Sequence, residues 1–428
     1  MATITVKYRS FGDGNDGMEM SSRTSEESLG KSLSIGQGDA QLYNQVPSEV
    51  QKITILDSTL REGEQGAGIS FTTRQRLQIA WMLDNFGVDY LEISPIVSKD
   101  HEECCKKMLR TGFNSKTVAH LRALPSDIDV ALRCGAEWIA MYHSVSDIHL
   151  EHKLRVSRET ALERSIKAVE YAKAHGLKLR FTLEDSSRSD PEFLKLFATE
   201  ICNAGADRIS LPDTLGALSP EGMYQMVTLI RGVTKTPIDI HCHNDLGLSL
   251  ANALAGIRAG ASQIHTTIDG VGERVGITSL AEIVITLSTI FGKKLNVKLE
   301  MLSELSALLN RYTGFSSGAS KPIVGENAYR HKAGTHVAAV IRNPIAYELV
   351  PPKLVGNHRR VVFGELSGKN GAAFFLKVLG LNPSVDEAIK FSQGLKKMRV
   401  GDLFELTLTD DLEAQAVEAD ELMKEVKR

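Results

Sequence analysis

The sequence predicts an α/β fold, namely a (β/α)8 TIM barrel followed by a mostly helical C-terminal extension. From residue 53 onward, short runs rich in β-branched residues alternate with amphipathic stretches of helical length. Eight such pairs in roughly 240 residues match the number and length of the units in this barrel. The alternative is an open doubly wound sheet, which the lack of a G-x-G-x-x-G turn after the first run disfavours.

Each predicted strand is a short run bounded by polar or turn-forming residues. The predicted strands are Ile53–Leu56, Val88–Ile93, Lys116–Ala119, Trp138–Met141, Leu177–Leu183, Arg208–Leu211, Ile238–His241 and Gln263–Ile268. The clearest helices between them are Thr73–Phe86, Thr160–Ala174 and Glu221–Val233. Ser219 and Pro220 open the last of these as N-cap and first-turn proline.

We expect three parts in the chain. Residues 1–50 are rich in Ser, Gly, Asp and Gln, so we expect a disordered extension there. Its apolar start, Ile4-Thr5-Val6, leaves open a segment that orders against a partner subunit. Residues 51–310 form the barrel, and residues 311–428 form a C-terminal subdomain. In that subdomain we expect a helix over Val385–Met398 and another in the charged tail from Asp410.

Composition and charge narrow the class of protein. Lys plus Arg is 50 and Asp plus Glu is 53, so the net charge of −3 gives no electrostatic reason to expect nucleic acid or an anionic membrane as the main partner. No apolar run reaches the length of a transmembrane helix. The five cysteines form no C-x-x-C pair, which suits a reducing compartment. We therefore expect a cytoplasmic enzyme.

Polar residues recur on the face of two strands that should point into the barrel. Arg180, Thr182 and Glu184 are two residues apart, and so are Asp239, His241 and His243. Helices cover the outside of a barrel, so a shared polar face must point inward. Buried polar groups at a strand end are costly unless they bind something, and active sites of barrels lie at these ends.

The pair His241 and His243 predicts a metal site. Two imidazoles at i and i+2 can reach one ion, and a carboxylate from another strand can complete the set. The turn from Asp57 to Gln65, directly after the first strand, offers such carboxylates. A structural histidine pair and a solvated acidic loop are the alternatives. The position of both segments at strand ends favours a shared divalent metal site.

Three separated segments together resemble a known enzyme family. Asp57–Gln65, His241–Gly247 and Gly270–Arg274 are similar to the signature segments of the Claisen-condensing, metal-dependent acyltransferases. That family includes 2-isopropylmalate, citramalate and homocitrate synthases, and the similarity runs from about Ile53 to about Gly368. The resemblance implies an acyltransferase barrel that binds a divalent metal (Zn, Mn, Mg or Co), a 2-oxo acid and acetyl-CoA.

The resemblance also implies roles for single residues. The residues that match the family's metal ligands are Glu62, His241 and His243. Arg61 matches the residue that stabilises the alkoxide formed on the keto carbon, and Gln65 matches a neighbour of the bound 2-oxo acid. His331 matches the base that deprotonates acetyl-CoA, with Glu184 and Tyr347 as its supporting partners. His336 is a weaker candidate. In relatives this segment comes from the second subunit, which implies a homodimer with shared active sites.

The substrate prediction depends on the inward face of the fifth strand. An Arg at position 180 suits a second carboxylate on the substrate, and an aliphatic oxo acid would leave that charge buried and unpaired. Arg180, Thr182 and Thr214 are similar to the residues that hold the distal carboxylate of 2-oxoglutarate in homocitrate synthases. His120 and the pair Gly276-Ile277 also match that pattern. We therefore predict formation of homocitrate, as in lysine biosynthesis through α-aminoadipate.

Other segments depart from the homocitrate synthase pattern. Tyr329-Arg330 precedes His331 where Phe and a small hydroxyl residue are expected, and Leu246-Gly247-Leu248 is closer to the isopropylmalate enzymes. Pro351–Arg360 resembles citramalate synthases equally well. Three other products, 2-isopropylmalate, citramalate and 2-phosphonomethylmalate, therefore stay open. A metal-dependent lyase or aldolase and a barrel kept as a binding scaffold are the remaining alternatives.

Overall fold

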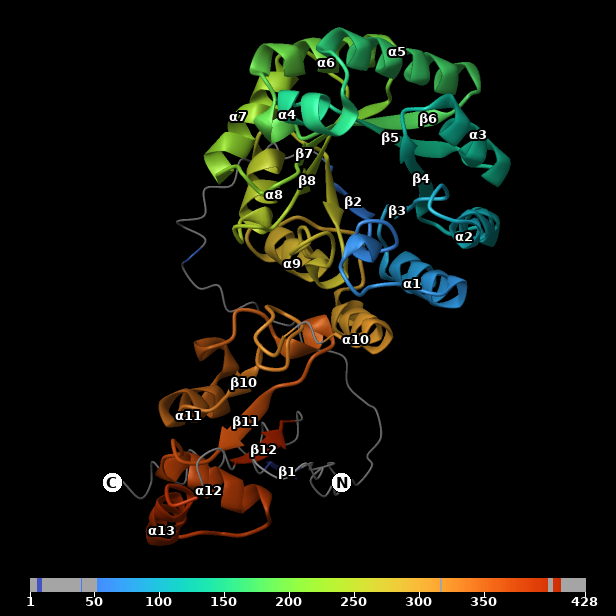
Figure 1. The fold of residues 1–428 in the computed structure, drawn as a ribbon. Helices are drawn as coiled ribbons and strands as arrows, with labels where there is room; N and C mark the ends of the chain where they lie inside the picture. Colours follow the sequence, from blue (N-terminus) through green and yellow to red (C-terminus); the bar gives the residue numbers. More distant parts are fainter. Residues whose placement is uncertain (1–5, 10–39, 41–51, 316–317, 399–402, 409–428) are drawn as a thin grey trace. The chain divides into compact units, whose positions relative to one another are not determined.

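The structure is a computed structural model that describes residues 6–9, 40, 52–315, 318–398 and 403–408 of the 428 (Figure 1). The chain forms two compact units. One comprises Asn44–Ser317, and the other combines Met1–Tyr43 with Gly318–Arg428. No helix within the described ranges is long and apolar enough to cross a membrane.

The larger unit is a closed barrel of parallel strands, as predicted. Its strands are β2 (Thr54–Asp57), β3 (Tyr90–Ile93), β4 (Lys116–Arg122), β5 (Trp138–Ser144), β6 (Lys178–Glu184), β7 (Arg208–Asp213), β8 (Ile238–Cys242) and β9 (Gln263–Thr266). The barrel closes where β9 pairs with β2, with Ile55 opposite Ile264. The predicted runs coincide with these strands, although β4 and β5 each extend three residues further, to Arg122 and Ser144.

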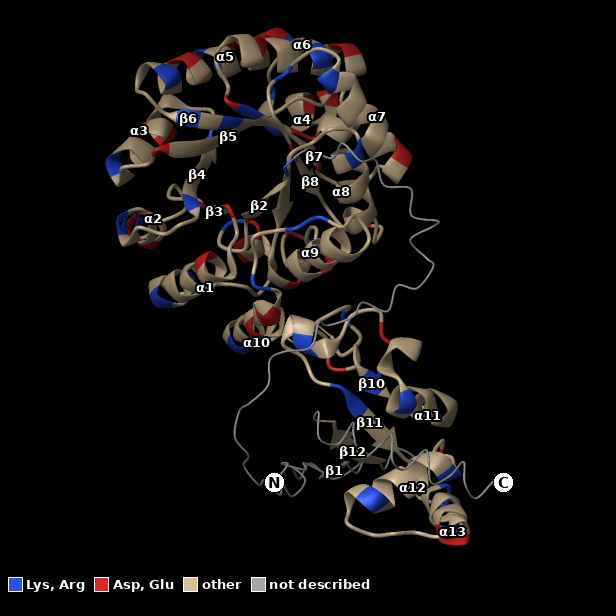
Figure 2. Ribbon diagram, turned by 180° about the vertical axis from the view of Figure 1, so that it is seen from behind, with Lys and Arg blue, Asp and Glu red and all other residues tan. Residues whose placement is uncertain are grey.

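Helices surround the strands in a ring (Figure 1). The main helices are α1 (Thr73–Phe86), α2 (Lys99–Thr111), α3 (Pro125–Cys134), α5 (Arg158–Ala174), α6 (Pro191–Asn203), α7 (Pro220–Arg231), α8 (Ser249–Arg258), α9 (Leu280–Thr289) and α10 (Leu302–Thr313). A short helix α4 (Asp147–His149) leads into η3 (Leu150–Leu154), a single π-helical turn. Basic and acidic segments are interspersed around this ring (Figure 2).

Local sequence signals explain where the helices begin. Thr72 caps α1 and forms a capping box with Gln75, and Ser219 caps α7 by accepting a hydrogen bond from the Gly222 backbone N–H. Proline occupies the first turn of α3, α6 and α7, where its missing N–H costs nothing. These signals are local, so the helix starts are readable from the sequence.

The alternation predicted for β6 is present. Phe181 points outward and packs on Phe197 of α6, with ring centroids 6.1 Å apart, and both side chains are fully buried. Its neighbours Arg180 and Thr182 therefore point inward. At the amino ends of the strands, Tyr90 and Trp138 pack edge to face next to the buried residues Leu56, Val118 and Ala140. The packed end closes the barrel, which leaves the carboxyl ends of the strands for the site.

The smaller unit combines helices with a sheet. Its helices are α11 (Gly334–Arg342), α12 (Lys369–Val378) and α13 (Val385–Leu395), and its strands are β1 (Val6–Arg9), β10 (Arg330–His331), β11 (Arg360–Phe363) and β12 (Leu403–Thr407). The strand order is β1-β12-β11-β10, with only β10 and β11 parallel. The helices pack on an apolar core that includes Val361, Phe363, Phe374 and Leu406.

Short 3₁₀ turns connect elements in both units at Gly63–Gln65, Ser186–Arg188, Ile268–Gly270, Leu299–Met301, Pro344–Ala346 and Pro352–Val355.

The sheet was not predicted from the sequence. The predicted helix over Val385–Met398 is present as α13, three residues shorter. Within the N-terminal region, β1 pairs with β12 of the same chain, whereas a disordered extension or a segment ordering against a partner subunit was expected. Apart from β1 and Ala40, residues 1–50 lie outside the described residues, as does the helix expected from Asp410.

Candidate metal and substrate site

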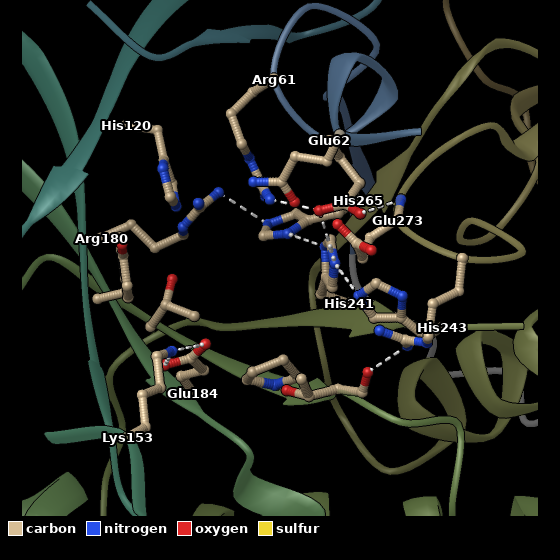
Figure 3. Close-up of a pocket in the computed structure, with 16 residues that line it drawn as sticks. Arg61, Glu62, His120, Lys153, Arg180, Glu184, His241, His243, His265 and Glu273 are labelled. Atoms are coloured by element: carbon tan, nitrogen blue, oxygen red, sulfur yellow. Dashed lines mark hydrogen bonds and ion pairs between the residues drawn. The ribbon is translucent and has the colours of Figure 1, made fainter. Parts of the chain in front are cut away.

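A cavity of about 330 Å³ lies at the carboxyl ends of the barrel strands (Figure 3). Polar side chains from seven strands or the turns after them line it. Ten of the twelve predicted site residues are among them: Arg61, Glu62, Gln65, His120, Arg180, Thr182, Glu184, Thr214, His241 and His243. The inward strand faces thus converge on one cavity, with Gln65 exposed.

Glu62, His241 and His243 form a cluster with the geometry of a metal site. The three residues can each offer one ligand atom, and these atoms lie within 4.8 Å of one another. His241 Nε2 is 3.3 Å from His243 Nε2 and 3.8 Å from Glu62 Oε2. All three side chains are buried. One carboxylate with two imidazoles is a donor set that fits a divalent ion, so the residues present fit the metal that the sequence implied.

The segment Gly270–Gly276 holds Glu62 in place. The backbone N–H of Glu273 donates a hydrogen bond to Glu62 Oε1 at 3.0 Å. A Cβ atom on Gly272 would lie 2.9 Å from the same oxygen, and one on Gly276 would lie 1.7 Å from the carbonyl oxygen of Gly270. Gly272 therefore allows the backbone to approach the carboxylate closely, and Gly276 allows the segment to turn back on Gly270, which gives the segment a physical role in orienting a metal ligand.

His265 is a further residue of the site that the sequence analysis missed. Its Nδ1 lies 3.3 Å from Nδ1 of His241, and its Nε2 lies 2.9 Å from Nη1 of Arg180. Burial, reinforced by the charge of Arg180, lowers the pKa of His265 to about 4. Burial also lowers the pKa values of His241 and His243, which keeps both imidazoles neutral and able to bind metal. The alternation in β9, with Gln263 and His265 on one face, was the available signal.

Arg180 has a counter-ion that the sequence analysis did not foresee. Glu92 of β3 accepts hydrogen bonds from Arg180 Nη2 at 2.5 Å and from Arg61 Nε at 2.7 Å. Burial opposes ionisation of Glu92, but the charges of Arg61 and Arg180 outweigh it and hold the pKa of Glu92 well below its usual range. The argument that an aliphatic oxo acid would leave Arg180 unpaired is therefore wrong. The two guanidinium groups share one buried carboxylate.

Two hydroxyl groups remain available to a ligand. Thr182 Oγ1 is buried and has no hydrogen-bond partner among the described residues. Thr214 Oγ1 accepts a hydrogen bond from the backbone N–H of Asp185 at 3.0 Å, which leaves its own proton free to donate. His120 stacks on Tyr142, with centroids 5.1 Å apart, and burial followed by the charge of Arg61 lowers its pKa to about 3. His120 is therefore a neutral group in the cavity wall.

Glu184 is held by groups on two neighbouring elements. Lys153 Nζ of η3 lies 2.7 Å from both carboxylate oxygens, and the Ser144 hydroxyl donates to one of them. Figure 3 shows Lys153 and Glu184 on the same side of the cavity. The sequence analysis missed Lys153, because a π-helical turn has no periodicity that would place the side chain.

The remaining predicted site residues, His331 and Tyr347, lie in the smaller unit and contact different partners. His331 Nε2 is 3.1 Å from Glu348 Oε1, and Arg359 binds both oxygens of Glu348, at 2.7 and 2.6 Å. Tyr347 stacks on His336, with ring centroids 3.9 Å apart. Tyr347, predicted as a partner of His331, thus contacts the other histidine of the segment. Glu348 and Arg359 were not predicted.

Comparison with known proteins agrees with this geometry. The HMGL-like family model matches residues 52–309, and a second model, described as homocitrate synthase post-HMGL domain-like, matches residues 323–401. The chain belongs to the HMGL-like family. It is therefore an enzyme of a metal-dependent group, and the resemblance inferred from the three separated segments is confirmed.

Relatives named for different activities are about equally similar to this chain. The chain is 41% identical to a probable 2-isopropylmalate synthase of Ignicoccus hospitalis, over 89% of this chain and 94% of the relative. It is 40% identical to a homocitrate synthase of Methanopyrus kandleri, over 82% and 89%. It is 39% identical to an (R)-citramalate synthase of Methanocaldococcus jannaschii, over 82% and 71%. Identity alone therefore does not rank the substrates.

A solved structure supports the fold of the larger unit. The HMG-CoA lyase of Bacillus subtilis matches with a TM-score of 0.57 and 22% identity, over 63% of this chain and 95% of the lyase. At this identity the match concerns the barrel alone. The residues of the smaller unit are matched by the homocitrate synthase-type model instead.

Proposed function

We propose that this protein condenses acetyl-CoA with 2-oxoglutarate and water to give homocitrate and CoA. The observation that carries the proposal is the convergence in one cavity of a Glu-His-His metal cluster, two arginines and two available hydroxyl groups. Homocitrate synthases among the relatives support this choice of reaction. Acetyl-CoA supplies the methyl carbon that becomes bonded to the keto carbon of the oxo acid.

The barrel residues bind and polarise the oxo acid in this proposal. A divalent ion held by Glu62, His241 and His243 would make the keto carbon more electrophilic. Arg61 lies beside Glu62, its Nη1 at 2.5 Å from Oε2, so its guanidinium borders the place where negative charge develops on the former keto oxygen. That oxygen takes up a proton to become the hydroxyl group of the product, and water cleaves the thioester to release CoA.

A histidine of the smaller unit takes the methyl proton of acetyl-CoA in this proposal. His331 and His336 are the two candidates, and their surroundings differ. His331 is within hydrogen-bonding distance of Glu348 and is only partly exposed. His336 and its stacking partner Tyr347 are both exposed. Exposure to an incoming substrate favours His336, while sequence resemblance favours His331. We propose that the segment acts on the cavity of the partner subunit in a homodimer, with Glu184 as its acidic neighbour.

Charge balance supports a dicarboxylic substrate. Arg61 and Arg180 both contact Glu92, and Arg61 also contacts Glu62, so two guanidinium groups face two carboxylates. A divalent ion held by Glu62, His241 and His243 would add two positive charges, which two substrate carboxylates would balance, and Thr182 and Thr214 line the same cavity and can donate hydrogen bonds. Formation of 2-isopropylmalate or citramalate is the second candidate. The pairing of Arg180 with Glu92 favours it, because this pairing reduces the cost of a substrate without a second carboxylate.

A CoA-release assay tests the proposed reaction class. The protein is stripped of metal with a chelator, reloaded with Zn, Mn, Mg or Co, and mixed with acetyl-CoA and 2-oxoglutarate, pyruvate, 2-oxoisovalerate or phosphonopyruvate. We expect release that depends on both metal and oxo acid, with the highest kcat/KM for 2-oxoglutarate. If none of the four oxo acids causes CoA release in any metal-loaded sample, the proposal is refuted. Cleavage of an acyl-CoA without condensation would favour a lyase.

A further inference from the structure

We propose that Lys153 is a positioning residue that holds Glu184 as an oriented carboxylate at the edge of the substrate cavity. This inference rests on the proposed function, because it assigns Lys153 a task in that reaction. Lys153 lies on η3, between α4 and α5, and no signature segment of the sequence includes it.

The backbone around Lys153 adopts a rare conformation that is typical of functional sites. Residues Leu150–Leu154 form a single π-helical turn, a rare conformation that is frequent at functional sites. The turn ends at Arg155, whose φ of 55° is uncommon for a residue other than Gly, and the Val156 N–H closes it on the Leu150 carbonyl at 3.1 Å. This conformation directs the Lys153 side chain to the wall of the cavity that contains Glu184.

The contacts of Glu184 show what Lys153 does there. Its ammonium group is 2.7 Å from each carboxylate oxygen, and the Ser144 hydroxyl donates to one of these oxygens. Donors on both oxygens fix the plane of the carboxylate as well as its charge. Lys153 also lies 6.0 Å from the ring centroid of Tyr142, which limits its own freedom.

The other titratable groups near Glu184 do not provide this charge. Tyr142 and His143 of β5 interact electrostatically with Glu184, but burial raises the pKa of Tyr142 and lowers that of His143, so both are neutral near pH 7. Asp185, directly after β6, is paired with Arg188, and Arg180 of β6 is paired with Glu92. Among the described residues, Lys153 is therefore the cation in contact with Glu184, so its removal should leave that carboxylate without the partner that orients it.

The test compares Lys153→Met with Lys153→Arg, Glu184→Gln and the Lys153→Met/Glu184→Gln double variant. Lys167→Met is the matched control, because Lys167 also pairs with a glutamate, Glu163, but on the exposed face of α5. For Lys153→Met we expect kcat/KM to fall about 10- to 100-fold, with little change in KM for the oxo acid and none in metal content. Lys153→Arg should restore most of the rate.

In the Glu184→Gln background, Lys153→Met should cause no further loss, because Lys153 acts through Glu184. Activity of Lys153→Met equal to that of Lys167→Met would overturn the inference, and so would additive losses in the double variant, which would mean that Lys153 contacts substrate directly. Circular dichroism checks that each variant is folded. A wild-type protein without condensation activity would overturn the proposed function as well, whereas an active wild type with an unaffected Lys153→Met overturns this inference alone.

Discussion

Replacing Glu92 by Gln should lower the free energy of unfolding by about 3 kcal/mol, because this carboxylate is the shared counter-ion of two buried guanidinium groups. Glu92 is 1% exposed and Arg180 is 3% exposed, so water cannot solvate the guanidinium group that loses its counter-ion. The distances are 2.5 Å to Arg180 Nη2 and 2.7 Å to Arg61 Nε. Gln keeps the shape of the side chain but removes the negative charge.

The effect should depend on pH. Burial alone would raise the pKa of Glu92. The charges of Arg61 and Arg180 outweigh burial and hold this pKa well below its usual 4.5. A lowered pKa means that the stabilisation is present above the usual value and is lost as the pH falls through the lowered one. The difference between wild type and Glu92→Gln should therefore be full at neutral pH and shrink on strong acidification.

Urea unfolding measures this difference, followed by circular dichroism at neutral pH and in acid. The matched control is Glu137→Gln, which removes an exposed carboxylate paired with Lys178 at 2.6 Å and should change stability far less. A Glu92→Gln protein as stable as the control at neutral pH would refute the assignment of Glu92 as a counter-ion. A loss that stays constant with pH would refute its ionisation.

Three further predictions concern the site. Arg180→Ala should reduce kcat/KM for 2-oxoglutarate at least about 10-fold more than for pyruvate, and equal losses in the substrate panel would contradict its role in reading the distal carboxylate. Gly272→Ala would place Cβ 2.9 Å from Glu62 Oε1, so metal affinity measured by calorimetry should fall about 10- to 100-fold; unchanged affinity would mean that the segment does not orient the ligand. One of the variants His331→Ala and His336→Ala should abolish solvent exchange of the acetyl-CoA methyl protons, which identifies the base; loss of exchange in neither variant would contradict a histidine base in this segment.

The sequence was sufficient to predict the barrel and most of its polar lining, because both depend on local periodicity. In β6, the period of two puts Arg180, Thr182 and Glu184 on one face, and the cavity contains all three. The separated segments that supply Glu62 and His241 meet because parallel strands end at the same edge of a barrel. No long-range pairing had to be guessed for these residues.

The residues that were missed have no periodic signal of their own. Glu92 is a single acidic residue in the apolar strand Tyr90–Ile93, and a sequence does not show that it meets two arginines from other strands. Lys153 is placed by a π-helical turn. The sheet of the smaller unit pairs Val6–Arg9 with Leu403–Thr407, a contact between opposite ends of the chain, and no local pattern encodes it.

Identification of the product tests the central claim most directly. Metal-loaded protein is incubated with acetyl-CoA labelled with ¹³C in the acetyl group and an equimolar mixture of 2-oxoglutarate, pyruvate and 2-oxoisovalerate, and the labelled acids are identified by mass spectrometry. We expect homocitrate as the main labelled product, with the label in its new acetate-derived arm. Labelled 2-isopropylmalate or citramalate as the main product would contradict the assignment of 2-oxoglutarate, and no labelled condensation product would contradict the reaction itself.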